Sequence, residues 1–431
     1  MPHAERMSEQ VDPTIMRHRH LEQIAIAALE CGRLLMETGA KSAVVATGMR
    51  KVARGLGAET THTRIGYASV EITVTHGQNT ITRMIAVGHH RVDMRLNHQV
   101  RSLCTEAADG GLTPADLFDR VRALPHRVPH HPWIMKAIAA GLACAAFGRL
   151  LGTDWISFAP IFAGSAIAQG VRMALAARHT NTFVLTAVVA LVASALAGLG
   201  AAAAGSQTLG IAMTASVLLL VPGVPSMNAQ TDIMEGYPTM GSARFVTVAM
   251  LLIFITVGMG AARIIVGPGL DDSLSPPALL MHQTAFGALA ATCFGVLFNF
   301  GARTLPWAAA AGGLALAVRT LGLEAGLPLE AASFIAAATL ALGVEILGAR
   351  PLRVPHAGQT LAVAGCIPMV PGGAAAQFII GLLELSSRAP AETEAALVAS
   401  TTAGIQVVFT LGALGAGLTI VRSIAPNRDF P

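Results

Sequence analysis

The stretch TFVLTAVVALVASALAGLGAAAA, residues 182–204, contains no charged side chain. A helix needs about 20 apolar residues to cross the hydrocarbon core of a bilayer. A surface helix of a globular protein needs only one apolar stripe, whereas this stretch is apolar almost all the way round. Residues 246–261 and 395–421 have the same character. The sequence therefore predicts a polytopic α-helical membrane protein.

The composition agrees with this prediction. Of the 431 residues, 53% are hydrophobic and 13% are charged, and the mean hydropathy is +0.59. Soluble domains average about 25% charged residues, so a soluble enzyme is disfavoured, and the hydrophobicity excludes a disordered chain. The net charge of +4 comes with few aromatic residues and no basic run, which argues against nucleic-acid binding.

The charged residues are concentrated near the N-terminus: residues 1–131 hold 29 of them and the other 300 residues hold 25. Apolar periodicity in this front part predicts helices, then two paired strands, then helices again. The expected ranges are helices at 14–37 and 41–56, strands at 68–75 and 80–87, and helices at 92–108 and 114–124. We expect a small cytosolic α+β domain over residues 1–131, with no cleavable signal peptide because its first 20 residues are polar.

The front domain shows no recognisable catalytic or metal-binding pattern. Eleven of the 14 histidines lie in it, including the pairs His18/His20 and His89/His90, but no pair has the spacing of a metal site. No hydrolase, metalloprotease, phosphate-loop or dinucleotide fingerprint is present, and the five scattered cysteines do not suggest a disulfide framework. We therefore expect no metal, no cofactor and no enzymatic activity.

The apolar body predicts about ten membrane spans. They are expected at 133–151, 155–176, 182–204, 207–222, 243–265, 277–298, 305–322, 330–348, 359–383 and 395–421. With the front domain inside, eight arginines fall on the cytoplasmic side and four on the other, as the positive-inside rule requires. Both termini are then cytoplasmic in a multi-pass protein of the inner (plasma) membrane.

The body also contains an internal repeat at an offset of 149 residues. Val221–Pro222–Gly223 matches Val370–Pro371–Gly372, Asn228 matches Gln377, and Glu235 matches Glu384. The repeats predicted from this offset cover residues 132–266 and 275–423, with five spans each. Because five is odd, the second repeat would be inverted relative to the first, which is common in secondary transporters.

The segment VPGVPSMNAQTD, residues 221–232, is the candidate substrate site. Its two prolines and its glycine must break a helix, and broken backbone at membrane depth survives only inside protein or beside water. A new helix start there attracts a carboxylate. The candidate substrate-binding residues are those of the two breaks and the amide and carboxylate positions after them: Pro222, Gly223, Asn228, Asp232, Gly372, Gly373 and Gln377.

Four carboxylates are candidates for carrying the coupling proton: Asp232, Glu235, Glu345 and Glu384. Ionisable groups within membrane spans are functional candidates by default. The alternative for Asp232 and Glu235 is a cytoplasmic loop after an interfacial turn, and Glu345 is near enough to a span end to reach the interface.

Three segments resemble a known family. LLMETGAKSAVVATGMRKVARGLGAE (34–59) and LVPGVPSMNAQTDIMEG (220–236) are similar to the first component of the threonine/serine exporter family, and IPMVPGG (367–373) is similar to its smaller second component. The resemblance implies a fusion of two components that are separate chains in succinate exporters. It also implies efflux of a small carboxylate-bearing metabolite, coupled to the proton gradient.

Together these observations predict a secondary transporter, an antiporter that exports threonine, serine or a related amino acid. Its expected partners are this substrate, protons and the lipid bilayer, and assembly into a homo-oligomer stays open. One alternative is a succinate or dicarboxylate exporter, which would prefer cationic groups that the spans offer sparsely. A second is a membrane-bound enzyme with its activity in the N-terminal domain, and a third is a regulatory role for that domain.

Overall fold

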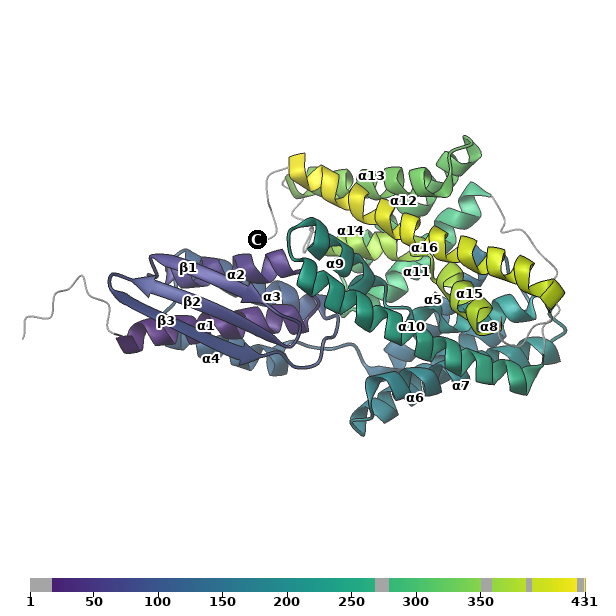
Figure 1. Ribbon diagram of the computed structural model, residues 1–431, viewed down its shortest axis with the longest axis horizontal. Coiled ribbons are helices and arrows are strands. Elements are labelled where there is room, and N and C mark those ends of the chain that lie inside the picture. Colours follow the sequence, from purple (N-terminus) through teal and green to yellow (C-terminus); the bar gives the residue numbers. More distant parts are fainter. Residues whose placement is uncertain (1–17, 268–278, 350–358, 385–389, 425–429, 431) are drawn as a thin grey trace, which may run out of the picture. The chain divides into compact units, whose positions relative to one another are not determined.

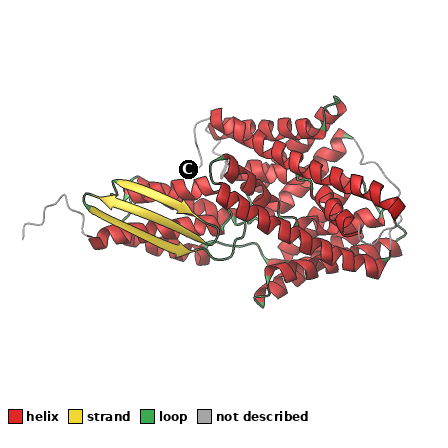
Figure 2. Ribbon diagram, in the orientation of Figure 1, coloured by secondary structure: helices red, strands yellow, loops and turns green. Residues whose placement is uncertain are grey.

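The computed structural model describes residues 18–267, 279–349, 359–384, 390–424 and 430 (Figure 1). The chain divides into two compact units. The first contains Met1–Arg91, Leu96–Val128 and Phe430–Pro431, and the second contains Val92–Arg95 and Pro129–Asp429. The described strands all belong to the first unit, and the second unit is helical in its described parts (Figure 2).

The first unit packs helices against a three-stranded antiparallel sheet of order β1-β2-β3. Val70, Ile72 and Val74 alternate along β2 and are fully buried, because α1 covers this part of the sheet. The elements in chain order are α1 (His18–Glu37), α2 (Ser42–Gly55), β1 (Thr60–Ile65), β2 (Ser69–His76), β3 (Asn79–Ala86), α3 (Met94–Ala108) and α4 (Pro114–Arg127).

The predicted strands at 68–75 and 80–87 agree with β2 and β3, but β1 was not predicted. Its sequence TTHTRI is polar, and only Thr61 and Ile65 are buried. An edge strand that turns so few apolar side chains inward has no alternating apolar pattern to detect. The structure therefore adds this strand to the expected sheet.

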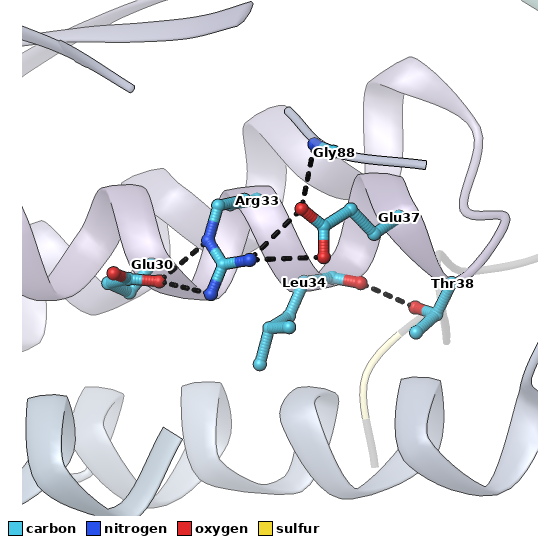
Figure 3. A network of polar contacts seen from close by, with 6 residues as sticks. All are labelled: Glu30, Arg33, Leu34, Glu37, Thr38 and Gly88. Carbon is cyan, nitrogen blue, oxygen red and sulfur yellow. Dashed lines mark hydrogen bonds and ion pairs between the residues drawn. The ribbon is translucent and has the colours of Figure 1, made fainter. Parts of the chain in front are cut away.

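A polar network fixes the end of α1 (Figure 3). Arg33 bridges Glu30 and Glu37, with its Nε 2.8 Å from Glu30 Oε2 and its Nη1 3.0 Å from Glu37 Oε1. Glu37 Oε1 also accepts the N–H of Gly88 at 2.8 Å. One carboxylate therefore holds the segment that leaves β3 against the last turn of α1.

The second unit is an array of helices. In chain order they are α5 (Trp133–Leu151), α6 (Phe158–Ala177), α7 (Thr182–Ala203), α8 (Leu209–Val217), α9 (Gly223–Met234), α10 (Pro238–Val266), α11 (Leu280–Leu297), α12 (Leu305–Glu324), α13 (Leu329–Ala349), α14 (Gln359–Cys366), α15 (Gly372–Glu384) and α16 (Pro390–Ile424). Within the described residues, seven helices are long and apolar enough to cross a membrane, or eight if the bent pair α8–α9 forms one span.

Two of the ten predicted spans are each interrupted. The expected span at 207–222 ends at Val217, followed by a short 3-10 turn, and the chain bends by 59° before α9. The new helix begins at Gly223, so Pro225 lies in its first turn, where a missing N–H costs little. The expected span at 359–383 is likewise divided into α14 and α15.

Two short segments of the second unit, Val92–Arg95 and residues 129–132, carry the chain to and from the first unit. Both are attached to the turn between α11 and α12, which we call the connector turn (residues 298–301). Asn299 Nδ2 donates to Asp93 Oδ1 at 3.1 Å and to the Pro129 carbonyl at 3.2 Å. Asn299 has a φ of +60°, a left-handed conformation that asparagine tolerates better than most residues.

Candidate substrate site

The two helix breaks have the same backbone. The N–H of the residue before each proline, Val221 or Val370, donates to the carbonyl three residues earlier, at 3.2 and 3.0 Å. The N–H of Gly223 and of Gly372 then donates two residues back, at 2.8 and 2.7 Å. Val221 and Val370 also share their conformation, with φ of −62° and −61°. All these positions are related by the offset of 149 residues.

The two breaks lie against each other in the second unit. A methyl group placed on Gly223 would lie 3.6 Å from Val370 Cγ2, and one placed on Gly372 would lie 3.4 Å from Val221 Cγ2 and 3.0 Å from Leu218 Cδ2. The two glycine–valine contacts exchange under the offset of 149. The residues predicted at the breaks, Pro222, Gly223, Gly372 and Gly373, therefore come together.

Side chains from neighbouring helices compensate the first break. The carbonyl of Ser216, next to the last residue of α8, accepts hydrogen bonds from Cys144 Sγ at 3.3 Å and Ser165 Oγ at 3.1 Å. Ser216 is 3% exposed, and a buried carbonyl that loses its helical partner needs another donor. Cys144 on α5 and Ser165 on α6 therefore make the end of α8 tolerable.

Asp232, in the last turn of α9, is fully buried and forms an ion pair. Its Oδ2 lies 2.9 Å from Nη1 of Arg244, which is 5% exposed. The negative end of the α9 dipole disfavours a carboxylate at this position, and Arg244 offsets both that effect and the desolvation of the charge. Asn228 lies one turn earlier on the same face and is also buried.

The path of α10 brings Arg244 to this place. Gly236, with a φ of +88°, ends α9 and allows the chain to reverse. At Gly241 the two helices approach so closely that an added methyl would lie 2.5 Å from the Ala229 carbonyl. Arg244, three residues later, then reaches Asp232. This pairing was not predicted, because the sequence places Arg244 among the arginines of the cytoplasmic side.

Gln230 is a second residue that was not predicted from the sequence. Its Nε2 donates to the carbonyl of Gly412 at 3.0 Å, which ties α9 to α16. A methyl group on Gly415 would lie 2.5 Å from Gln230 Cδ, so the glycine makes room for the amide. The sequence did contain a signal for Gln230: it is a polar residue shortly after a helix break, and α16 offers small residues such as Gly412 and Gly415 for it to pack against.

The other candidates are not gathered at the breaks in this way. Glu235 is half-buried in the turn after α9, Glu345 is half-buried on α13, and Gln377 is exposed on α15. The side chain of Glu384 lies outside the described residues. The structure thus brings together the two breaks, and it buries Asn228 and Asp232 on the helix after the first.

The two helix starts differ in how many backbone N–H groups do not donate to a nearby carbonyl. At the start of α9, the N–H groups of Gly223 and Ser226 donate to nearby carbonyls, and Pro225 has no N–H. Among the described hydrogen bonds, this leaves the N–H of Val224 available to a ligand. At the start of α15, Gly372 and Ala375 donate locally, which leaves Gly373 and Ala374 within the described hydrogen bonds. The second break therefore offers more donors to an anion, while the first carries the charged side chains.

Two family models match the chain. One, described as "Putative threonine/serine exporter", covers residues 27–266, and the other, described as "Threonine/Serine exporter, ThrE", covers residues 283–424. The chain is similar to the "Probable succinate transporter subunit YjjP" of Klebsiella aerogenes, with 29% identity over 55% of this chain and 93% of the relative. It is 30% identical to the protein of that name from Escherichia coli K12, over 56% of this chain and 93% of the relative. No solved structure matches.

Proposed function

The chain belongs to the threonine/serine exporter family, and we propose that it exports a small carboxylate-bearing metabolite through the paired helix breaks, in exchange for protons. The observation that carries the proposal is the contact between the two breaks beside the buried Asp232–Arg244 pair. Threonine and serine are the first candidate substrates, in keeping with the descriptions of both family models. Transport is the activity of this family, which argues against an enzyme.

The architecture that we propose for the membrane part is an inverted repeat of two five-helix halves. Its support is the offset of 149, which relates the start of α9 at Gly223 to that of α15 at Gly372 and relates the two 3-10 turns. If α8–α9 and α14–α15 each form one bent span, each half crosses the bilayer five times. The front unit and both termini then lie on the cytoplasmic side of the inner membrane.

The exposed tryptophans at the two ends of α5 agree with this placement. Trp133 is 60% exposed and Trp155 is 64% exposed, and indoles concentrate at membrane interfaces. The 19 residues of α5 extend about 28 Å, close to the hydrocarbon thickness of about 30 Å. The length of α5 thus suits a helix that crosses one bilayer, with an exposed tryptophan at its start and another four residues after its end.

In the proposed mechanism the substrate carboxylate binds where the two breaks meet. The N–H groups of Gly373 and Ala374 and the positive end of α15 attract it. Asn228 supplies a side-chain amide for the remaining polar groups of the substrate. Binding energy here comes from backbone donors that the helix break itself provides.

Asp232 is the proposed site of proton coupling. In the ionised state it is held by Arg244 at 2.9 Å, and a proton taken from the other side of the membrane would weaken this pair. Arg244 would then be able to turn toward the substrate carboxylate. Arg244 thus exchanges Asp232 for the substrate carboxylate, and this exchange links proton uptake to substrate movement. The two halves of the protein then move relative to each other about the breaks.

An efflux measurement tests the proposal. A host lacking its own exporters is loaded with threonine, serine or succinate precursors, and internal and external pools are followed. We expect clearance of one metabolite that depends on the protein and is abolished by an uncoupler. Asp232→Asn should remove that clearance, whereas Asp119→Asn, the same change at an exposed position of α4, is the matched control. Intact, pH-dependent clearance by Asp232→Asn would remove Asp232 from the mechanism.

Succinate is the second candidate substrate. Relatives over the first half of the chain are named as subunits of a probable succinate transporter, and the buried Arg244 supplies a cation suited to a dicarboxylate. Selective clearance of succinate, with threonine and serine pools unchanged, would favour this candidate over the amino acids.

A further inference from the structure

Helix α2 of the first unit lacks a side chain at one point of its apolar stripe. Val44, Gly48 and Val52 are each one turn apart on α2, so they share one face, and all three are buried. A glycine inside a helix is less favourable than an alanine, so its presence calls for a packing reason. The groups around Gly48 supply that reason.

Two side chains occupy the space that a side chain at position 48 would take. A methyl group placed on Gly48 would lie 2.8 Å from Cδ1 of Leu35 on α1, and 3.2 Å from Cζ of Phe430. Leu35 is fully buried, whereas Phe430 is half-buried, so the ring can leave without opening the core. Phe430 follows α16 in the sequence, yet it belongs to the same compact unit as α2.

A lysine on the same face of α2 makes a second contact with this ring. Lys51 lies one turn after Gly48, and its Nζ is 4.8 Å from the centre of the Phe430 ring. An ammonium within about 6 Å of a ring centroid is attracted by the face of the ring. An aliphatic side chain could fill the space at Gly48, but it could not make this contact. We call the site formed by Gly48, Leu35 and Lys51 the Gly48 notch.

The position of Phe430 in the sequence gives this contact a consequence. Helix α16 ends at Ile424 and belongs to the second unit, so six peptide bonds connect it to Phe430. A link of this length reaches at most about 22 Å. A seated Phe430 therefore tethers the end of a second-unit helix to the first unit.

The tether is reversible because a single ring makes a weak contact. An isolated contact of this size corresponds to a dissociation constant of about millimolar, and a short link supplies an effective concentration of about millimolar or a few times more. The seated and released states are then comparable in population, with roughly one to ten seated molecules for each released one.

We propose that the Gly48 notch is a docking site for an aromatic side chain, and that Phe430 seated in it is a releasable latch between α16 and the first unit. Movement of α16 then reaches the first unit through a contact that opens and closes, besides the covalent segments at residues 92–95 and 129–132. The latch requires no particular substrate, so it stands or falls separately from the proposed transport.

Photo-cross-linking in the full-length protein tests the docking. p-Benzoylphenylalanine replaces Phe430 in one variant and Phe409, which is 61% exposed on α16, in the matched control. After irradiation in detergent micelles, we expect the label at position 430 to attach to α2 and the label at position 409 not to. Gly48→Leu, which fills the notch, should abolish the attachment.

A milder variant keeps this test valid if Gly48→Leu folds poorly. Lys51→Gln removes only the ammonium over the ring, and it should reduce the attachment about twofold to fivefold. Hydrogen exchange then measures the strength of the latch without a label. Phe430→Ala should speed exchange of the α2 amides about twofold to tenfold, which is the stabilisation expected from the seated state, whereas Phe409→Ala should not change it.

Three results would overturn the latch. One is a label at position 430 that attaches only to α16 or to detergent, and another is unchanged exchange of the α2 amides in Phe430→Ala. The third is a cross-linked product of twice the chain mass on a denaturing gel, which would assign the Gly48 notch to Phe430 of a second copy.

Discussion

The first break, over residues 218–222, and the second, over 367–371, lead into helices with different side chains. The backbone hydrogen bonds of the two breaks agree to within 0.2 Å, and a methyl group placed on either glycine would contact the valine of the other break. After the first break the chain buries Asn228 and Asp232, whereas the offset position of Asn228 is the exposed Gln377 and that of Asp232 is Gly381. Arg244 has Thr393 at its offset position.

This difference separates architecture from chemistry. A break that recurs with the same dihedral angles is a property of the repeat, and it places two helix starts side by side. The buried ion pair occurs in one half only among the described residues, so it is not needed to form a break. A site with pseudo-symmetric backbone and asymmetric charge suits a transporter that must distinguish two directions of movement.

The largest expected effect concerns the ion pair. Asp232→Ala removes the carboxylate opposite the buried Arg244, and breaking such a pair typically costs about 3–5 kcal/mol. The double variant Asp232→Ala, Arg244→Ala should recover much of this loss, because no buried charge remains there. Unfolding by denaturant in mixed micelles measures both.

The matched control for the ion pair is Gln377→Ala, an exposed change after the second break, which should stay within about 0.5 kcal/mol of the wild type. A double variant no more stable than Asp232→Ala alone would show that an uncompensated charge is not the source of the loss.

A smaller effect is expected at the end of α8. Removing both Cys144 and Ser165 donors, as Cys144→Ala with Ser165→Ala, leaves the Ser216 carbonyl unsatisfied at membrane depth, at a cost of about 1–3 kcal/mol. Either single change should cost less, because the other donor remains. Cys293→Ala, at the offset position of Cys144, measures the loss of sulfur packing alone, and an equal loss in all these variants would contradict the hydrogen-bond explanation.

The two break glycines should respond differently to alanine. A methyl on Gly223 meets Val370 at an ordinary 3.6 Å, whereas a methyl on Gly372 meets Leu218 at a tight 3.0 Å. Gly223→Ala should therefore be neutral or stabilising by up to about 1 kcal/mol, since alanine favours a helix, and Gly372→Ala should be destabilising by about 1 kcal/mol. Thermal unfolding of the two variants side by side tests the order, and the reverse order would show that the two breaks do not pack in this way.

The smallest effect concerns the loops after α5 and α11, where Asp154 has Arg303 at its offset position. Burial would raise the pKa of Asp154, but hydrogen bonds from Ser157, Ser206 and Gln207 favour the ionised form, and the net pKa lies below its usual value. A lower pKa in the folded state means that ionised Asp154 stabilises the fold above about pH 4, the unfolded value. This contribution is lost as the pH falls through the folded value.

The measurement for Asp154 is the melting temperature of the wild type and Asp154→Asn between pH 7 and pH 3. Their difference should be largest near neutral pH and shrink below about pH 4. A constant difference across this range would show that the charge of Asp154 does not stabilise the loop.

The sequence was sufficient for features that depend on local chemistry. The spacing of Pro222, Gly223 and Pro225 predicted the interruption, and the 149-residue offset predicted a second one. Alternation at Val70, Ile72 and Val74 predicted β2. These features arise from backbone sterics or from the burial of one face of a strand, and both effects depend on residues that are close together in the sequence.

Other features depend on contacts that no local pattern encodes. Arg244 meets Asp232 only because Gly236 reverses the chain and Gly241 lets α10 pass close to α9. Gln377 aligns with Asn228 in sequence, yet its helix face is exposed in the described structure. The strand β1 was missed because its sequence TTHTRI is polar, with Ile65 as its one apolar residue, and so shows no alternating apolar pattern.

The connector turn has a consequence for how such a protein is assembled. Its residues come with the second half: Asn299 donates to Asp93, the Phe298 carbonyl accepts the N–H of Met94, and the Phe300 carbonyl accepts from Arg95 and His131. Cutting the chain between residues 267 and 279 would turn these bonds into contacts between two polypeptides. In one continuous chain the partners meet at an effective concentration of about millimolar, whatever the expression level. Continuity of the chain therefore makes the stoichiometry of the two halves one to one without a binding equilibrium.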